Sequence, residues 1–301
     1  MNMTAFQQLY ELMRKKSAIH SSLWLKSREE FGEEWEREIS INISRVFGET
    51  NNLQWEEAVS GYAAFCIDAL KAQIFFEKNG RYKAASYADC LELCYHNPDY
   101  MKLRYLPGQY LSHYIWPHHQ RMLRHYIKEL IPEIRDEISL FFEVGVGCGM
   151  YSQKTLEGIP ETLGIGFDIS NYALEFTYRV AEAHGLSDRY EVRNQDIVEK
   201  IPEKKADFVI SQEVIEHLEN PESFISGLYK ATRSGGWGYI SAAVNAAHTD
   251  HIYLYRSPDS VKKQIEASGW KILDVQIEEN YPEKPKEFRP TIAGFFVRKD
   301  H

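Results

Sequence analysis

The stretch from residue 141 to residue 150, Phe-Phe-Glu-Val-Gly-Val-Gly-Cys-Gly-Met, constrains the fold of this chain more than any other. An apolar run there ends in three alternating glycines, Gly145, Gly147 and Gly149, with Glu143 just ahead of them. Glycines at this spacing let a backbone turn tightly and lie against a bulky ligand. Because a helix-like segment follows, its free N–H groups point into the same space. The stretch therefore predicts a strand-turn-helix unit that holds a nucleotide-like cofactor.

Residues 1 to about 135 carry apolar residues at helical spacing and few strand signals. The widest apolar stripe runs from residue 54 to residue 79, and Gly80 follows where a helix would end. We therefore expect an N-terminal, all-helical domain over residues 1–135. Its other predicted helices are 4–15, 30–46, 83–95 and 118–130.

From about residue 138, strand-like and helix-like segments alternate with short connections. We therefore expect an α/β domain, residues 136–301, in which a mainly parallel sheet is covered on both faces. The last two strand-like segments have no helix between them, so we expect them to pair antiparallel. The strand-like segments are 138–144, 162–168, 189–193, 206–211, 236–244, 271–277 and 292–298.

Acidic residues follow the second and third strand-like segments. Asp168 lies 19 residues after Gly149, and a carboxylate there can accept both hydroxyls of a ribose. Asp196, within Asn194-Gln195-Asp196-Ile197, can accept from an adenine amino group. In a doubly wound sheet these strand ends meet at one edge, so together they predict a nucleoside site beside the glycines.

Two details separate this site from a dinucleotide site. The dinucleotide fingerprint needs Gly or Ala at position 150, where this chain has Met150. Glu143 would repel a pyrophosphate, whereas a carboxylate there suits a cofactor that carries a cation. S-adenosylmethionine carries an ammonium and a sulfonium group and no phosphate. The pattern therefore favours S-adenosylmethionine, and a nicotinamide oxidoreductase is the weakest reading.

Five stretches occur in the order and at the strand ends of a known family: Glu143 to Gly149, Gly166 to Ser170, Gln195 to Ile197, Ala206 to Pro221, and Ser-Gly-Gly-Trp-Gly at 234–238. With them, residues 138–298 resemble the class I S-adenosylmethionine-dependent methyltransferases. The resemblance implies a doubly wound, Rossmann-like sheet of seven strands in the order 3-2-1-4-5-7-6, with strand 7 antiparallel. It also implies that the N-terminal helices form a lid over the methyl donor.

By the same resemblance, the cofactor contacts are the glycine turn, the strand-end acids and the turn after the fourth strand. They are Glu143, Gly145, Gly147, Gly149, Asp168, Ile169, Asp196, Ile197, Ser211, Gln212 and Glu213. Met150 departs from the family pattern, and we expect its bulk to shift the following helix slightly.

The segment after the fifth strand, residues 245–255, is rich in groups that exchange protons or bind substrates. Histidine side chains can exchange protons near neutral pH, so we expect His248 or His251 to be the general base. The alternative for His251 is a structural role with Asp250, which would tie the loop to the sheet. The predicted substrate contacts in this segment are Asn245 and Tyr253.

A second group of aromatic and histidine residues lies at 105–119, just before the α/β domain. Tyr110, His113 and Tyr114 share one face of the predicted helix. With His118 they are predicted to form a substrate wall beneath the lid. The alternative is an ordinary aromatic core whose polar tips bond to the backbone.

Composition limits the partners. The formal net charge is −9 and no dense run of Lys or Arg occurs, so we expect no nucleic-acid partner. No segment is expected to span a membrane, and the four cysteines form no Cys-x-x-Cys pair, which is typical of a reduced, cytoplasmic protein. The apolar helical half leaves a homodimer open.

The chain is therefore predicted to be an S-adenosylmethionine-dependent methyltransferase acting on a small metabolite, aromatic or amino-acid-like, at N, O or C. A lid of about 135 residues encloses a site, which suits small substrates. One alternative is a metal-dependent methyltransferase of a 2-oxo acid or catechol-like substrate, with a metal on His248, His251 and an acid such as Asp250. His-x-x-His is a weak metal signal, so we predict no metal. Another alternative is a non-catalytic binding protein that kept the cofactor fold.

Overall fold

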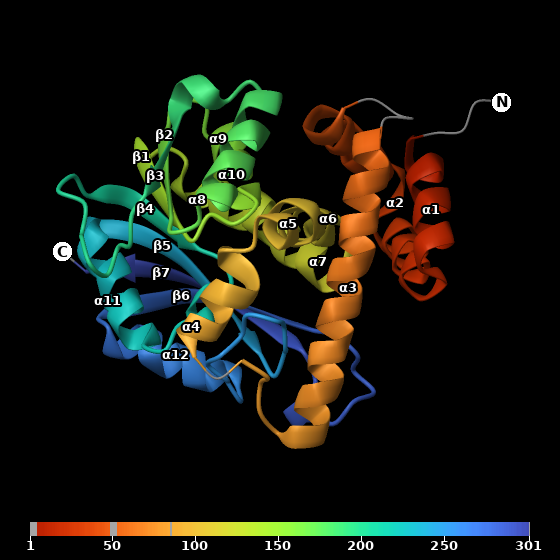
Figure 1. The fold of residues 1–301 in the computed structure, drawn as a ribbon. Helices are drawn as coiled ribbons and strands as arrows, with labels where there is room; N and C mark the ends of the chain where they lie inside the picture. The colour runs from red at the N-terminus through yellow and green to blue at the C-terminus, as the bar shows by residue number, and fades with distance from the viewer. Residues whose placement is uncertain (1–4, 49–52, 85, 301) are drawn as a thin grey trace.

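The computed structural model of the chain describes residues 5–48, 53–84 and 86–300. Its strands are β1 (Leu140–Val144), β2 (Leu163–Asp168), β3 (Tyr190–Asn194), β4 (Ala206–Ser211), β5 (Thr232–Val244), β6 (Trp270–Glu279) and β7 (Thr291–Lys299). Within the described ranges these seven strands form one sheet in the order β3-β2-β1-β4-β5-β7-β6 (Figure 1). β7 pairs antiparallel with β5 and β6, and the other neighbouring strands are parallel. The predicted fold class and strand order are confirmed.

The helices that connect the strands are α9 (Met150–Gly158), α10 (Asn171–Ala183), α11 (Pro221–Ala231) and α12 (Pro258–Ala267). They cover both faces of the sheet (Figure 1). Successive side chains of a strand point to opposite faces, so Phe141 packs with α9 and α10 while Phe142 packs with α11 and α12. The inner strands β1, β4, β5 and β7 are therefore buried on both faces, which explains their continuous apolar runs, whereas the edge strands β3 and β6 are partly exposed.

Polar caps start these helices where the sequence indicates them. The Ser170 hydroxyl accepts from the backbone N–H of Ala173, at the start of α10. Asn220 and Ser257 cap α11 and α12 in the same way, each followed by a proline in the first turn. Each cap satisfies an N–H group that the helix itself leaves without a partner.

The first part of the helical region (residues 5–134) consists of α1 (Ala5–Lys16), α2 (Ala18–Phe47) and α3 (Leu53–Asn79). α2 begins earlier than the predicted helix 30–46. It contains a kink at Gly32, whose φ of 77° lies in the left-handed region. The predicted helix corresponds mainly to the part of α2 after the kink, and the sequence analysis missed the part before it. α3 ends immediately before Gly80, as predicted.

The second part of the helical region continues to the sheet without a long loop. Its elements are α4 (Tyr87–Cys90), η1 (Leu91–Tyr95), α5 (Pro98–Tyr100), η2 (Met101–Tyr105), α6 (Leu106–Ile115), α7 (Pro117–His125), η3 (Tyr126–Leu130) and α8 (Ile131–Ile134). The Tyr126 ring stacks on Phe208 of β4 and lies 5.1 Å from the Tyr239 ring of β5. These helices therefore cover part of the sheet, and the domain boundary near residue 135 stays a prediction.

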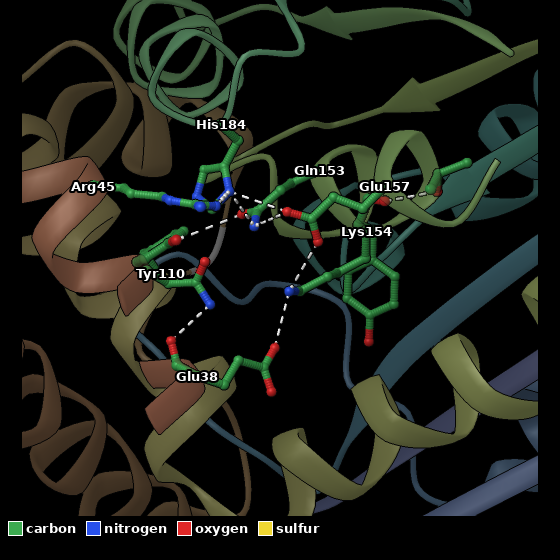
Figure 2. A network of polar contacts seen from close by, with 10 residues as sticks. Glu38, Arg45, Tyr110, Gln153, Lys154, Glu157 and His184 are labelled. Atoms are coloured by element: carbon green, nitrogen blue, oxygen red, sulfur yellow. Dashed lines mark hydrogen bonds and ion pairs between the residues drawn. The ribbon is translucent and has the colours of Figure 1, made fainter. Parts of the chain in front are cut away.

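A buried polar network joins α2 to the helix that follows the glycines (Figure 2). Lys154 of α9 is 8% exposed, and its Nζ lies 2.9 Å from Glu38 Oε1 and 3.1 Å from Glu157 Oε2. His184 Nδ1 lies 3.0 Å from the other oxygen of Glu157. Burial would raise the pKa of Glu157, but His184 and Lys154 outweigh it and lower the pKa to about 2. The network fixes the helical region against α9.

One helix in the part of the chain that the structure describes, α3, is long and apolar enough to cross a membrane by length and composition alone. The sequence-based expectation that no segment approaches that length is therefore too strict. Half of its most apolar window is buried, and Trp55, Tyr62 and Phe65 lie in the core. Core helices of soluble proteins pass the same test, so the finding is weak evidence for a membrane.

Candidate cofactor site

A cavity of about 830 Å³, part of it open to solvent, lies at the carboxyl ends of β1, β2, β3 and β4. We call it the strand-end cavity. Its floor comes from the ends of these strands and the turns after them. Its cover comes from the helical region, through Tyr87, Tyr95, Met101, Tyr105 and Gln109. The cavity lies where ligands bind in doubly wound sheets.

The glycine turn needs glycine for two separate reasons. Gly145, Gly147 and Gly149 have φ values of 78°, 50° and 73°, which side chains other than glycine rarely adopt. A Cβ on Gly147 would come within 2.5 Å of Gln109 Oε1. Gly145 and Gly147 line the strand-end cavity, whereas Gly149 lies beneath α10, where a Cβ would meet Thr177. The backbone can thus approach a ligand closely at the first two positions.

The two predicted acids line the same cavity. Asp168 Oδ1 accepts from Ser170 N at 2.8 Å, and Oδ2 accepts from Gly147 N at 3.3 Å. Removal from bulk water raises the pKa of Asp168 above its ordinary value. Asp196 Oδ1 accepts from Val198 N at 2.7 Å, which leaves its other oxygen for a ligand. Ile169 and Ile197, which follow the acids, also line the cavity.

The turn after β4 carries backbone strain. Glu213 has a φ of 50°, and its N–H donates to Ser241 Oγ at 3.0 Å. Ser241 Oγ in turn donates to Gln212 Oε1 at 2.7 Å. Gln212 and Glu213 line the strand-end cavity, whereas Ser211 is buried beneath them. Residues held in such sparsely populated conformations cluster at functional sites, because the surrounding structure must hold them there.

Glu143 is buried and lies outside the lining of the strand-end cavity. Its carboxylate accepts from the backbone N–H of Ser152 at 2.8 Å and from the Ser152 hydroxyl. Burial raises the pKa of Glu143 to about 8. The residue therefore anchors the first turn of α9, and its direct contact with a cofactor stays a prediction.

A much smaller cavity, the inner cavity, adjoins the first and shares Gln109, Gly145 and Gln212 with it. His113 and Tyr151 also line it. Gln109 Oε1, His113 Nδ1 and Tyr151 Oη are buried and have no hydrogen-bond partner among the described residues. Buried polar atoms without partners cost free energy, so this cavity fits a polar ligand group or ordered water.

Only one residue of the predicted substrate wall, His113, lines either cavity. Of its members, His113 faces the inner cavity, whereas Tyr110 and Tyr114 are fully buried and in ring contact with each other. His118 stacks on Trp116, outside both linings. α6 is buried on all sides. That Tyr110, His113 and Tyr114 share one helix face therefore does not predict which of them meets a cavity.

The other two predicted substrate contacts lie away from the cavities. Asn245 has a φ of 50°, and its Nδ2 donates to the carbonyls of Arg256 and Lys286. Tyr253 Oη accepts from Gln264 of α12 at 2.9 Å. Neither residue lines the strand-end or inner cavity, and both fix the loop in place.

The predicted catalytic histidines lie in the loop after β5, behind the cavity lining. His248 Nδ1 lies 2.9 Å from Asp250 Oδ1, and its ring packs between Phe65 and Tyr105. His248 Nε2 has no partner within the described ranges. His251 Nδ1 donates to the Ala246 carbonyl, and burial lowers the pKa of His251 to about 3.

His217, which follows β4 in the chain, lines the strand-end cavity. Its Nδ1 lies 3.2 Å from Asp250 Oδ2. Burial alone would lower the pKa of His217, but Asp250 outweighs it and raises the pKa to about 10. Burial would likewise raise the pKa of Asp250, but His217 and His248 hold it well below its usual range. Tyr95 of the cover donates to the same carboxylate at 2.9 Å.

Residues 142–240 match the family model of the methyltransferase domain. The strand order and the glycine turn belong to the same class. The match covers about a third of the chain, and the seven-stranded sheet has the strand order of the Rossmann-like methyltransferase fold. The family implies S-adenosylmethionine as the cofactor. No match was found among the curated proteins.

Solved structures share the fold of this chain at low identity. An O-methyltransferase family protein from Burkholderia thailandensis is 10% identical, with a TM-score of 0.57, over 98% of this chain and 94% of that one. The mitomycin 7-O-methyltransferase MmcR is 13% identical, with a TM-score of 0.57, over 81% of this chain and 71% of that one. The cyclase SpnF is 14% identical, with a TM-score of 0.50, over 60% and 81%. At these identities the likeness shows the fold alone.

Sequence reasoning missed most of the residues that cover the strand-end cavity. Tyr87, Tyr95 and Met101 were not singled out, and Tyr105 was grouped with residues that face elsewhere. Each lies on a short helical or π-helical element, where no regular stripe marks an inward face. Only the high share of tyrosine in the chain gave a signal, and it does not distinguish a cover from a core.

Proposed function

We propose that this chain transfers the methyl group of S-adenosylmethionine to a small-molecule acceptor. The observation that carries the proposal is the floor of the strand-end cavity. There Gly145 and Gly147 present bare backbone beside Asp168, and Asp196 lies at the next strand end. The floor offers carboxylates and backbone groups and no cluster of basic side chains among its lining residues, which fits a nucleoside with a cationic tail better than one with phosphates.

The residues of the floor have separate tasks in this proposal. Asp168 would accept from the ribose hydroxyls, because its two oxygens are already held in place by Ser170 N and Gly147 N. Asp196 would accept from the adenine amino group. The glycine turn would lie against the methionine part, where a side chain at position 147 would collide with Gln109.

The sulfonium supplies an activated methyl group, so the protein mainly has to align an acceptor with it. Such alignment contributes up to roughly 7–11 kcal/mol. The cover residues Tyr95, Met101 and Tyr105 would exclude water from the reacting atoms. The inner cavity, with the unpaired Gln109 Oε1 and His113 Nδ1, supports an acceptor that carries polar groups.

An acceptor that carries a proton also needs a base. His248 remains our proposal for this role, since its ring contacts Tyr105 of the cavity cover and its Nε2 has no partner among the described residues. His251 is the weaker base, because burial keeps its imidazole neutral and poorly basic. A general base contributes on the order of 10²- to 10⁴-fold, so kcat of His248→Asn should fall by that range.

Calorimetry with S-adenosylmethionine and with its demethylated product tests the first step. We expect one site per chain for both compounds, and absence of heat at millimolar donor would remove the proposal. Methyl transfer from a labelled donor to panels of phenols, amines and 2-oxo acids then tests the second step. The net charge of −9 leads us to propose that nucleic acids are not acceptors, and RNA serves as the comparison substrate.

A further inference from the structure

Three buried side chains converge where η5 (Ile215–His217) meets the loop after β5. They are Glu216, His217 and His251, which are 0%, 8% and 9% exposed. One nitrogen or oxygen atom from each lies within 4.8 Å of the atoms from the other two. Two imidazoles and one carboxylate at such separations match the donor set of many transition-metal sites.

The carboxylate of this cluster accepts a hydrogen bond through only one of its two oxygens. Glu216 Oε1 accepts from Ala243 N at 3.1 Å, but Oε2 is buried and has no hydrogen-bond partner in the described ranges. The backbone carbonyl of Glu216 accepts from Ile252 N and Tyr253 N, which ties η5 to the loop. An unpaired buried carboxylate oxygen is costly, so a cation at this point would relieve a real deficit.

Each of the two histidines is held in place through one ring nitrogen. His251 Nδ1 donates to the Ala246 carbonyl at 2.8 Å, which leaves Nε2 as its free ring nitrogen. His217 Nδ1 lies 3.2 Å from the Asp250 carboxylate and 3.1 Å from the Asp250 carbonyl. Metal-binding histidines are commonly held in this way, with the second ring nitrogen bonded to a carboxylate or a backbone carbonyl.

We propose that Glu216, His217 and His251 bind a divalent first-row transition-metal ion. Three protein ligands leave at least one coordination position open, which is the arrangement of reactive metal sites. His217 also lines the strand-end cavity, so the ion would lie at its wall. This set differs from the one that the sequence suggested, because His248 bonds to Asp250 and is replaced by Glu216 and His217.

The ion would give the methyltransferase a means to select its acceptor. A molecule with two adjacent oxygens, such as a 2-oxo acid or a catechol, could fill the open positions and would lose a proton to the proposed base, His248. Its oxygen or enolate carbon would then bond to the methyl group as the sulfonium–methyl bond breaks, with S-adenosylhomocysteine as the leaving group. This use rests on the proposed methyl transfer, whereas metal binding itself does not. The rival explanation is an ion-pair cluster of Asp250, His217 and Glu216 without metal.

Cobalt(II) is the probe, because its visible absorption reports coordination by protein ligands. The full chain, treated with a chelator and dialysed, is titrated with Co²⁺, and bound metal is counted by elemental analysis. We expect one equivalent with tetrahedral or five-coordinate absorption. His251→Asn and Glu216→Gln should each weaken binding by at least about 100-fold, since even loss of an outer-shell partner costs 10–100-fold.

His125→Asn is the matched control, because this histidine, the last residue of α7, pairs with Asp274 of β6 and is not part of the cluster, so the variant should bind metal as the unchanged chain does. Less than one equivalent in the unchanged chain, or equal binding by the His251 and Glu216 variants, would overturn the proposal. If a variant does not fold, the number of Co²⁺ equivalents bound by the unchanged chain decides the proposal by itself. Calorimetry with S-adenosylmethionine on the metal-free chain is separate, so failure of donor binding would count only against the proposed methyl transfer.

Discussion

The strand-end cavity is built from two regions that use different chemistry. Its floor, from the ends of β1 to β4, consists of backbone and short acidic side chains such as Asp168 and Asp196. Its cover, from residues 87–109 of the helical region, consists of aromatic and other long side chains. The floor depends on backbone geometry that neighbouring residues fix, whereas the cover depends on packing between helices far apart in the chain. We infer that the floor determines which cofactor binds and the cover determines which acceptor.

Asp168→Ala is the change that should separate the two regions most clearly. It removes a carboxylate that would accept two ribose hydroxyls, and hydrogen bonds to charged groups contribute about 1.5–3 kcal/mol each. We therefore expect the affinity for S-adenosylmethionine to fall by at least about 100-fold. Calorimetry measures the change. Asp188→Ala, at an exposed acid beyond α10, is the control and should bind as the unchanged chain does.

The floor could be predicted from the sequence because each of its parts is a local pattern. The glycines of 145–149 need positive φ, and Asp168 and Asp196 follow apolar strands whose carboxyl ends must meet at one edge. The caps at Ser170 and Asn220 mark helix starts in the same local way. Sequence periodicity therefore fixed both the fold and this half of the site.

The cover and the metal cluster could not be predicted, because they depend on contacts between distant segments. The sequence placed Tyr110 and Tyr114 at the substrate, whereas both are buried in the core between α6 and its neighbours. Glu216 and His251 lie 35 positions apart and meet only when the loop after β5 folds back on η5. The spacing of residues along the sequence does not predict that two such distant segments will come into contact.

Lys154→Met tests how strongly the two regions are joined. The change leaves Glu38 and Glu157 without the ammonium group between them (Figure 2). Breaking a fully buried pair costs about 3–5 kcal/mol, but these carboxylates are about a third exposed, so we expect roughly 1–3 kcal/mol of lost unfolding free energy. Denaturant unfolding measures it. Lys262→Met removes the exposed pair with Glu266, and a loss as large there would contradict this account.

Glu143→Gln tests how the stability of the chain depends on pH through Glu143, which lies on β1 just before the glycine turn. The pKa of Glu143 is raised to about 8 in the folded chain, so the folded state binds the proton more tightly than the unfolded state does. The contribution of Glu143 to stability is therefore fully present below its unfolded-state pKa of about 4.5 and is lost as pH rises towards 8, by at most about 1.4 kcal/mol per pH unit. Thermal unfolding from pH 5 to pH 8 should show a flatter profile for the Gln variant. Parallel profiles would show that Glu143 is not the group responsible.

Tyr87→Ala should have the smallest effect, and it tests whether the cover matters to the cofactor at all. Tyr87 lines the strand-end cavity together with Asp168 and Asp196, and burial and then these two acids raise the pKa of Tyr87 to about 12. Its backbone N–H is anchored separately by Glu219, so truncation should leave the chain trace intact. Loss of one aromatic contact of about 1 kcal/mol predicts three- to tenfold weaker donor binding, with Tyr87→Phe unchanged. A loss as large as that of Asp168→Ala would mean that the cover, and not the floor alone, determines which cofactor binds.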